Sequence, residues 1–160
     1  MVNSPQWLAD KLQEEGEKTI LFFQELPETA WELELYSDGA LWRVKDVLAH
    51  FVVTEVGIPR LMREVLAGGS GSPDDFDLDD YNRRHVVGLE NLTVPVLLER
   101  FADLRGQTVR FVADLSQDQL AVEGRHPFLG LSPLVDMIRL MYRHIQIHQR
   151  DIRRALTATT

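Results

Sequence analysis

The sequence of 160 residues contains no cysteine. A chain without cysteine has no disulfide scaffold, no thiolate zinc site and no cysteine nucleophile. Any thiol that takes part in its chemistry must therefore arrive with a substrate or cosubstrate. Without disulfides, the fold must be stabilised by a hydrophobic core, and a chain of this length is long enough to build one.

Basic residues are also scarce: 17 lysines and arginines face 25 aspartates and glutamates, so the net charge is −8 at pH 7. Nucleic acid and anionic lipid surfaces bind proteins mainly through clusters of basic side chains. The sequence shows no such stripe. We therefore predict a small-molecule substrate, with no nucleic-acid partner and no membrane partner.

Long hydrophobic runs are missing as well. No apolar run approaches the roughly 20 residues that cross a bilayer. Residues 1–6 lack the basic and apolar segments of a signal peptide. These absences predict a cytoplasmic protein. The composition, 44% hydrophobic and 26% charged, is that of a globular chain, and we expect a single domain over residues 1–160.

The apolar residues that are present recur with helical period. The segments that show this period are residues 5–25, 43–66, 94–115 and 133–156, and a shorter helix is expected at 81–89. Ser4, Thr93 and Ser132 stand where N-caps are expected, each with a proline in the first turn that follows. No stretch shows the alternation of a strand. The pattern predicts an all-α fold, a four-helix bundle.

The histidines carry the strongest functional signal. His144 and His148 are four residues apart in the last predicted helix, so their Cβ atoms should lie about 5–6 Å apart on one face. Two imidazoles so placed can share a cation, and His50 on the second helix is the best third ligand. Thr54, one turn later, is a candidate pocket residue. The same spacing also occurs in solvated or core histidine pairs, so the spacing alone leaves both interpretations open.

Three further residues are candidates for the surroundings of such a site. Asp151 lies one turn after the histidine pair, where it either orients a ligand ring or forms an ion pair with Arg150 or Arg154. His126 precedes the last helix and either lines a cleft or lies in a surface loop. His85 is either a fourth ligand or substrate contact, or part of a solvated helix face.

Three segments of the chain resemble the DinB-like superfamily, which includes the mycothiol-dependent maleylpyruvate isomerase N-terminal domain and the colibactin self-resistance protein. The segments are residues 42–50 (WRVKDVLAH), 126–134 (HPFLGLSPL) and 142–152 (YRHIQIHQRDI). The resemblance implies a bundle in up-down-down-up order with a divalent metal, zinc or nickel, on His50, His144 and His148. The isomerase branch has Glu at the position of His144, so this chain looks more like the three-histidine type.

Three protein ligands would leave one metal position open, as in catalytic sites. Water or a low-molecular-weight thiol bound there becomes a nucleophile at neutral pH. We consider three hypotheses: a metal-dependent thiol S-transferase or hydrolase acting on a small electrophile, a non-catalytic sequestration or resistance protein, and a structural bundle with core histidines. The resemblance and the number of large apolar residues also favour a homodimer.

Overall fold

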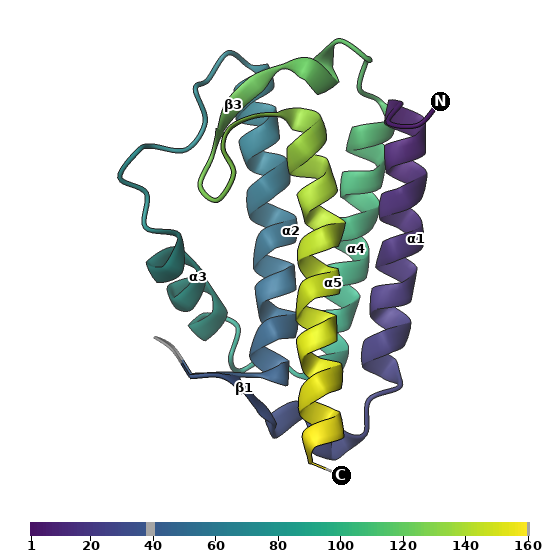
Figure 1. Ribbon diagram of the computed structural model, residues 1–160, viewed down its shortest axis with the longest axis vertical. Coiled ribbons are helices and arrows are strands. Elements are labelled where there is room, and N and C mark those ends of the chain that lie inside the picture. Colours follow the sequence, from purple (N-terminus) through teal and green to yellow (C-terminus); the bar gives the residue numbers. More distant parts are fainter. Residues whose placement is uncertain (38–40, 160) are drawn as a thin grey trace.

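The computed structural model describes residues 1–37 and 41–159. Four long helices pack side by side (Figure 1): α1 (Pro5–Gln24), α2 (Val44–Leu66), α4 (Val94–Ala113) and α5 (Leu134–Ala158). Helices α1 and α5 run in one direction, and α2 and α4 run in the other (Figure 1). The neighbours α2 and α4 are therefore parallel, joined by a long crossover that contains α3 (Leu78–Val87). This is the up-down-down-up bundle expected from the resemblance.

Two of the three predicted helix caps are confirmed. Ser4 and Thr93 begin α1 and α4, and each side chain accepts a hydrogen bond from a backbone N–H in the first turn. The prediction for Ser132 is wrong, because Pro133 is the N-cap of α5 and Ser132 belongs to a strand. Its hydroxyl donates to the carbonyl of Gly130 at 2.9 Å instead.

The expectation of no strands is also wrong. Two small antiparallel ladders are present, β1 (Glu34–Tyr36) with β2 (Trp42–Arg43), and β3 (Glu123–His126) with β4 (Gly130–Pro133). Strands of two to four residues are too short to display an alternating pattern in the sequence. Short 3₁₀ helices precede each ladder, η1 (Glu28–Glu32) and η2 (Gln119–Ala121). None of the described helices is long and apolar enough to cross a membrane.

The loop that follows α2 is fixed to strand β3. The backbone N–H of Arg125 donates to the carbonyl of Ser70 (2.9 Å), and the N–H of Ser72 donates to the carbonyl of Arg125 (2.8 Å). Between them Gly71 has φ +93°, and a Cβ there would lie 2.4 Å from the Arg125 oxygen. Only glycine fits this crossing. The loop and the β3–β4 hairpin therefore form one connected cover over the sides of α2 and α5.

A buried ion pair separates the two halves of the core. One hydrophobic cluster contains Leu12 and Met141, and the other contains Phe101. Between them the Arg105 Nη2 and Nε atoms donate to Glu55 at 2.6 and 3.1 Å, and both side chains are about 3% exposed. Arg105 also donates to the carbonyls of Leu12 and Met141. A guanidinium buried this deeply is stable only because each of its nitrogen atoms has a hydrogen-bond partner.

Candidate functional site

Helices α2 and α5 bring the three predicted histidines together. The Nε2 atom of His144 lies 3.0 Å from the Nε2 of His50 and 2.9 Å from the Nε2 of His148. The donor nitrogens of the three rings all lie within 4.8 Å of one another. His50 is 4% exposed, and the other two rings are partly buried. The same ring atom of each histidine therefore points to one common place inside the bundle.

Tyr36, on β1, holds the ring of His148. The Tyr36 hydroxyl donates to the Oδ2 of Asp151 at 2.6 Å and lies 2.8 Å from the Nδ1 of His148. Because its one proton is used on Asp151, the hydroxyl must accept from the His148 Nδ1–H. The Nε2 of His148 then carries a lone pair. Tyr36 thus links Asp151 to the His148 ring, and the other Asp151 oxygen lies 3.6 Å from Arg150, so the two predicted contacts do not exclude each other.

The three Nε2 atoms do not form a consistent hydrogen-bond network by themselves. If His144 Nε2 carries a proton, it can donate to only one of its two neighbours. If it carries a lone pair, it faces the lone pair of His148. Either way one of the contacts of about 3 Å has no bridging proton, which is unfavourable for buried polar atoms. A cation between the three lone pairs removes this conflict, so the donor set fits a metal ion.

The environment keeps these rings neutral. Burial lowers the pKa of His50 well below its usual value, and the neighbouring His144 and His148 lower it further. Burial is also the main cause that lowers the pKa of His144 to about 3 and that of His148 to about 4. Neutral imidazole is the form that binds metal, so the site is ready for a cation at pH 7 without releasing protons.

Acid is expected to destabilise the metal-free protein. The three histidines titrate lower in the folded chain than in the unfolded chain, where the pKa is about 6.5, so the unfolded state binds more protons as the pH falls. Each ring then contributes a loss of at most about 1.4 kcal/mol per pH unit below pH 6.5. Urea unfolding between pH 7.5 and 5.5 measures this loss. A free energy of unfolding that stays constant over that range would contradict the expectation. In a His148→Leu variant, the free energy of unfolding should fall less steeply with decreasing pH.

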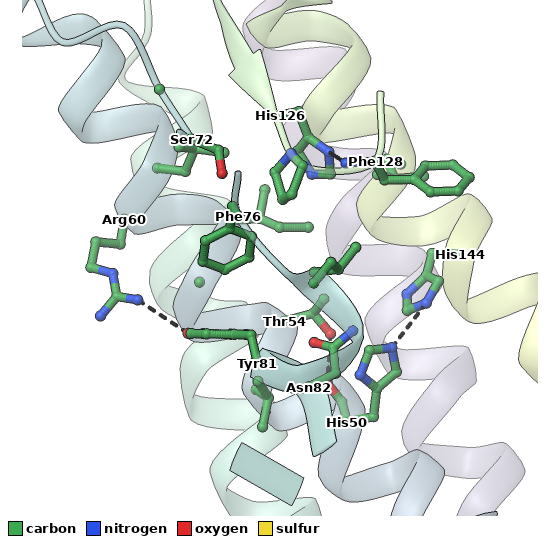
Figure 2. A pocket seen from close by; sticks show the side chains of 18 of the residues that line it. His50, Thr54, Arg60, Ser72, Phe76, Tyr81, Asn82, His126, Phe128 and His144 are labelled. Carbon is green, nitrogen blue, oxygen red and sulfur yellow. Dashed lines mark hydrogen bonds between the residues drawn. The ribbon is translucent and has the colours of Figure 1, made fainter. Parts of the chain in front are cut away.

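A cavity of about 550 Å³ opens beside the histidines (Figure 2). It lies between α2, α3, α5, the loop after α2 and the β3–β4 hairpin. His50 and His144 form part of its wall, together with Thr54, whose hydroxyl donates to the His50 carbonyl at 2.7 Å. A ligand at the end of the cavity formed by His50 and His144 lies next to two of the three histidines. Proteins usually bind small molecules in concave, mainly apolar cavities of this kind.

The other two predicted residues have different positions. His126 is buried on the cavity wall rather than in a surface loop, and burial lowers the pKa of its ring to about 4. His85 lies on the exposed face of α3. Its ring lies against the ring of Tyr81 at a tilt of 31°, and its Nδ1 is 2.7 Å from the Tyr81 carbonyl oxygen. Among the described residues, His85 belongs neither to the histidine cluster nor to the cavity lining.

Several solved structures share this fold. YfiT from Bacillus subtilis, described as a probable metal-dependent hydrolase with an unusual four-helix bundle topology, has a TM-score of 0.78 and 15% identity over 99% of this chain and 89% of its own. The colibactin self-resistance protein ClbS, in complex with double-stranded DNA, has a TM-score of 0.75 and 12% identity over 98% and 97%. The mycothiol-dependent maleylpyruvate isomerase has a TM-score of 0.70 and 14% identity, over 92% of this chain and 59% of its own.

The exclusion of nucleic acid must be corrected. ClbS has the same fold and was crystallised with double-stranded DNA. Net charge describes the whole molecule, whereas a nucleic acid contacts one face, so an acidic protein can still present a local basic surface. The acidic composition is therefore no ground for excluding a nucleic-acid partner from this fold.

A comparison with curated proteins found no match. A family model, described as the DinB superfamily, matches residues 8–152. The matched region includes the four long helices almost completely and all three clustered histidines. The family model covers far more than half of the sequence, and the bundle has the order implied by the resemblance: the chain belongs to the DinB superfamily.

Proposed function

We propose that His50, His144 and His148 bind one divalent metal ion, zinc or nickel. The observation that carries the proposal is the convergence of three Nε2 atoms, with two separations of 2.9 and 3.0 Å. Tetrahedral zinc with Zn–N bonds of about 2.0–2.1 Å separates its ligand nitrogens by about 3.3 Å. The nitrogens of these two pairs need to move apart by only a few tenths of an ångström to reach that separation, and the nitrogens of His50 and His148 lie within 4.8 Å of each other.

The remaining residues suit a reactive site more than a purely structural one. When bound, such a metal supplies Lewis acidity and lowers the pKa of a water or thiol. Tyr36 and Asp151 orient His148 so that the lone pair of its Nε2 points to the place where the three rings meet. The cavity beside His50 and His144 excludes bulk water from part of a bound substrate and orients it.

We infer that the reaction is thiol transfer to, or hydrolysis of, a small electrophile. The hydrolase and isomerase neighbours support this class, and the absence of cysteine means that a thiol nucleophile would come from a cosubstrate. The test presents zinc- or nickel-loaded protein with epoxides, alkyl halides and unsaturated oxoacids, each with and without a low-molecular-weight thiol. Product formation should follow metal occupancy, and turnover that survives complete chelation would contradict the proposal.

A second function is favoured by one observation. The neighbour ClbS is named a self-resistance protein, and the cavity here is large enough to hold a small molecule without reacting with it. A sequestering protein would bind an electrophile stoichiometrically and release it unchanged on denaturation. Mass spectrometry of the released ligand separates this function from catalysis, which yields a modified product.

Replacing Tyr36 with phenylalanine is expected to lower zinc affinity about 10- to 100-fold, because outer hydrogen-bond partners fix ligand rings and their tautomers. The Tyr36→Phe change removes the acceptor of His148 Nδ1–H and leaves Asp151 without its donor. Competition with a chromophoric chelator measures the affinity. Tyr142→Phe, in the other half of the core, is the matched control and should bind zinc like the wild type. Equal affinities of all three proteins would contradict a role for Tyr36.

We also propose that the chain forms a homodimer. Light scattering should then give twice the mass of 18.4 kDa for a single chain. A mass of one chain over a wide range of protein concentration would reject the dimer.

A further inference from the structure

The cavity wall carries one polar group whose hydrogen-bonding role is fixed by the backbone, the ring of His126. Its Nδ1 accepts from the backbone N–H groups of Phe128 (3.0 Å) and Leu129 (3.2 Å). A ring nitrogen that accepts hydrogen bonds carries no proton, so the proton of the neutral ring is on Nε2. The turn between β3 and β4 therefore makes His126 Nε2–H a hydrogen-bond donor.

This donor has no partner in the part of the chain that the structure describes, although the residue is only 5% exposed. The protein does not fully enclose the Nε2 atom of His126, so this atom remains in contact with open space. His126 and His144 both line the cavity, and Figure 2 shows the His126 ring beside Phe128. Because buried polar groups are nearly always hydrogen-bonded, a ligand or water in the cavity must accept this bond.

The wall around this donor is mainly apolar. The side chains that provide this apolar surface are Val53, Ile58, Leu61, Phe76, Leu140 and Ile147. The two charged lining residues, Arg60 and Glu64, are exposed and opposite in sign, so they give no net preference for a charged ligand. A volume of about 550 Å³ lies within the usual range of small-molecule sites.

We propose that the cavity binds a small uncharged carbonyl compound with an aromatic or branched apolar body, whose carbonyl oxygen accepts the hydrogen bond from His126 Nε2–H. An apolar wall favours the body, and the donor that the backbone fixes favours an oxygen acceptor. Ser72 and Asn82 also line the cavity, but no hydrogen bond among the described residues fixes the orientation of their side chains. One part of this inference rests on the proposed function, namely that the carbonyl compound is the substrate of the three-histidine site. Binding itself involves His126 and the cavity wall and requires no metal.

The test uses the chelated full-length protein and three probes that share a phenylbutyl body: 4-phenyl-2-butanone, butylbenzene and 4-phenylbutyrate. We expect the ketone to bind most tightly and to shift the ¹⁵N resonance of His126 Nε2. His126→Asn should lower ketone affinity about three- to tenfold, the value of one hydrogen bond, and leave butylbenzene affinity unchanged. The side-chain oxygen that this substitution introduces can still accept from the turn N–H groups, but the shorter side chain has no donor at the position of the ring Nε2.

The same substitution at the exposed His85 is the control and should change no affinity. The proposal is overturned if the ketone does not bind the wild type, if butylbenzene or the carboxylate binds more tightly, or if His126→Asn weakens ketone and butylbenzene equally. Because metal is absent throughout, a failure of the metal site leaves these results unaffected. The two proposals can therefore fail separately.

Discussion

Glu55→Gln is expected to lower the free energy of unfolding by about 3–5 kcal/mol. The substitution keeps the size of the side chain but removes the charge that Arg105 faces between the two hydrophobic clusters. Arg105 is only 3% exposed. Without the carboxylate, its guanidinium still bears most of the cost of leaving water, and little attraction is left to offset that cost. Urea unfolding monitored by circular dichroism measures the difference.

Two controls make this prediction specific to the ion pair. Glu99→Gln, on the exposed side of α4, should change stability by no more than about 0.5 kcal/mol. The double variant Glu55→Leu with Arg105→Met should be more stable than Glu55→Leu alone, because it leaves no unpaired buried charge. A loss below 1 kcal/mol for Glu55→Gln would show that the pair contributes no more than a surface contact.

His144→Ala is expected to reduce zinc affinity by more than 100-fold. His144 lies between the other two rings, within 3.0 Å of both Nε2 atoms, so its removal leaves two nitrogens in place of three. A directly bound nitrogen should contribute more than an outer hydrogen-bond partner, whose loss costs about 10- to 100-fold. Titration against a chelator of known affinity gives the dissociation constant.

His85→Ala is the matched control, because this histidine is exposed on α3 and lies outside the cluster. It should bind zinc like the wild type. The helical circular dichroism of His144→Ala should match that of the wild type, since the hydrophobic core does not depend on the metal. Unchanged zinc affinity in His144→Ala would show that the metal, if bound, lies elsewhere.

The sequence contained enough information for the bundle and for the histidine cluster. The spacing of His144 and His148 puts two rings on one helix face. The place of His50 on the second predicted helix made it the best third candidate, and the resemblance then implied the same three residues. The helix order also came from the resemblance, because apolar periodicity defines helices but not their directions. The structure places the three rings as these two arguments expected.

Two important features could not be predicted, for different reasons. Tyr36 lies in a strand of three residues that has no periodic signal, and it meets His148 only through tertiary packing across 112 positions. Glu55 and Arg105 do carry a signal, since each is a charged residue at a position of the buried helix face. Periodicity identifies such positions, but it does not say which two of them pair in space.

We propose above all that His50, His144 and His148 hold a divalent metal at the edge of the cavity. Anomalous scattering from crystals of the zinc-loaded protein tests it most directly, because it locates the metal without assuming its ligands. We expect one strong peak per chain, about 2.0–2.1 Å from the Nε2 atoms of the three histidines. A zinc-loaded crystal with no peak among these rings, or with its peak on other side chains, would contradict it.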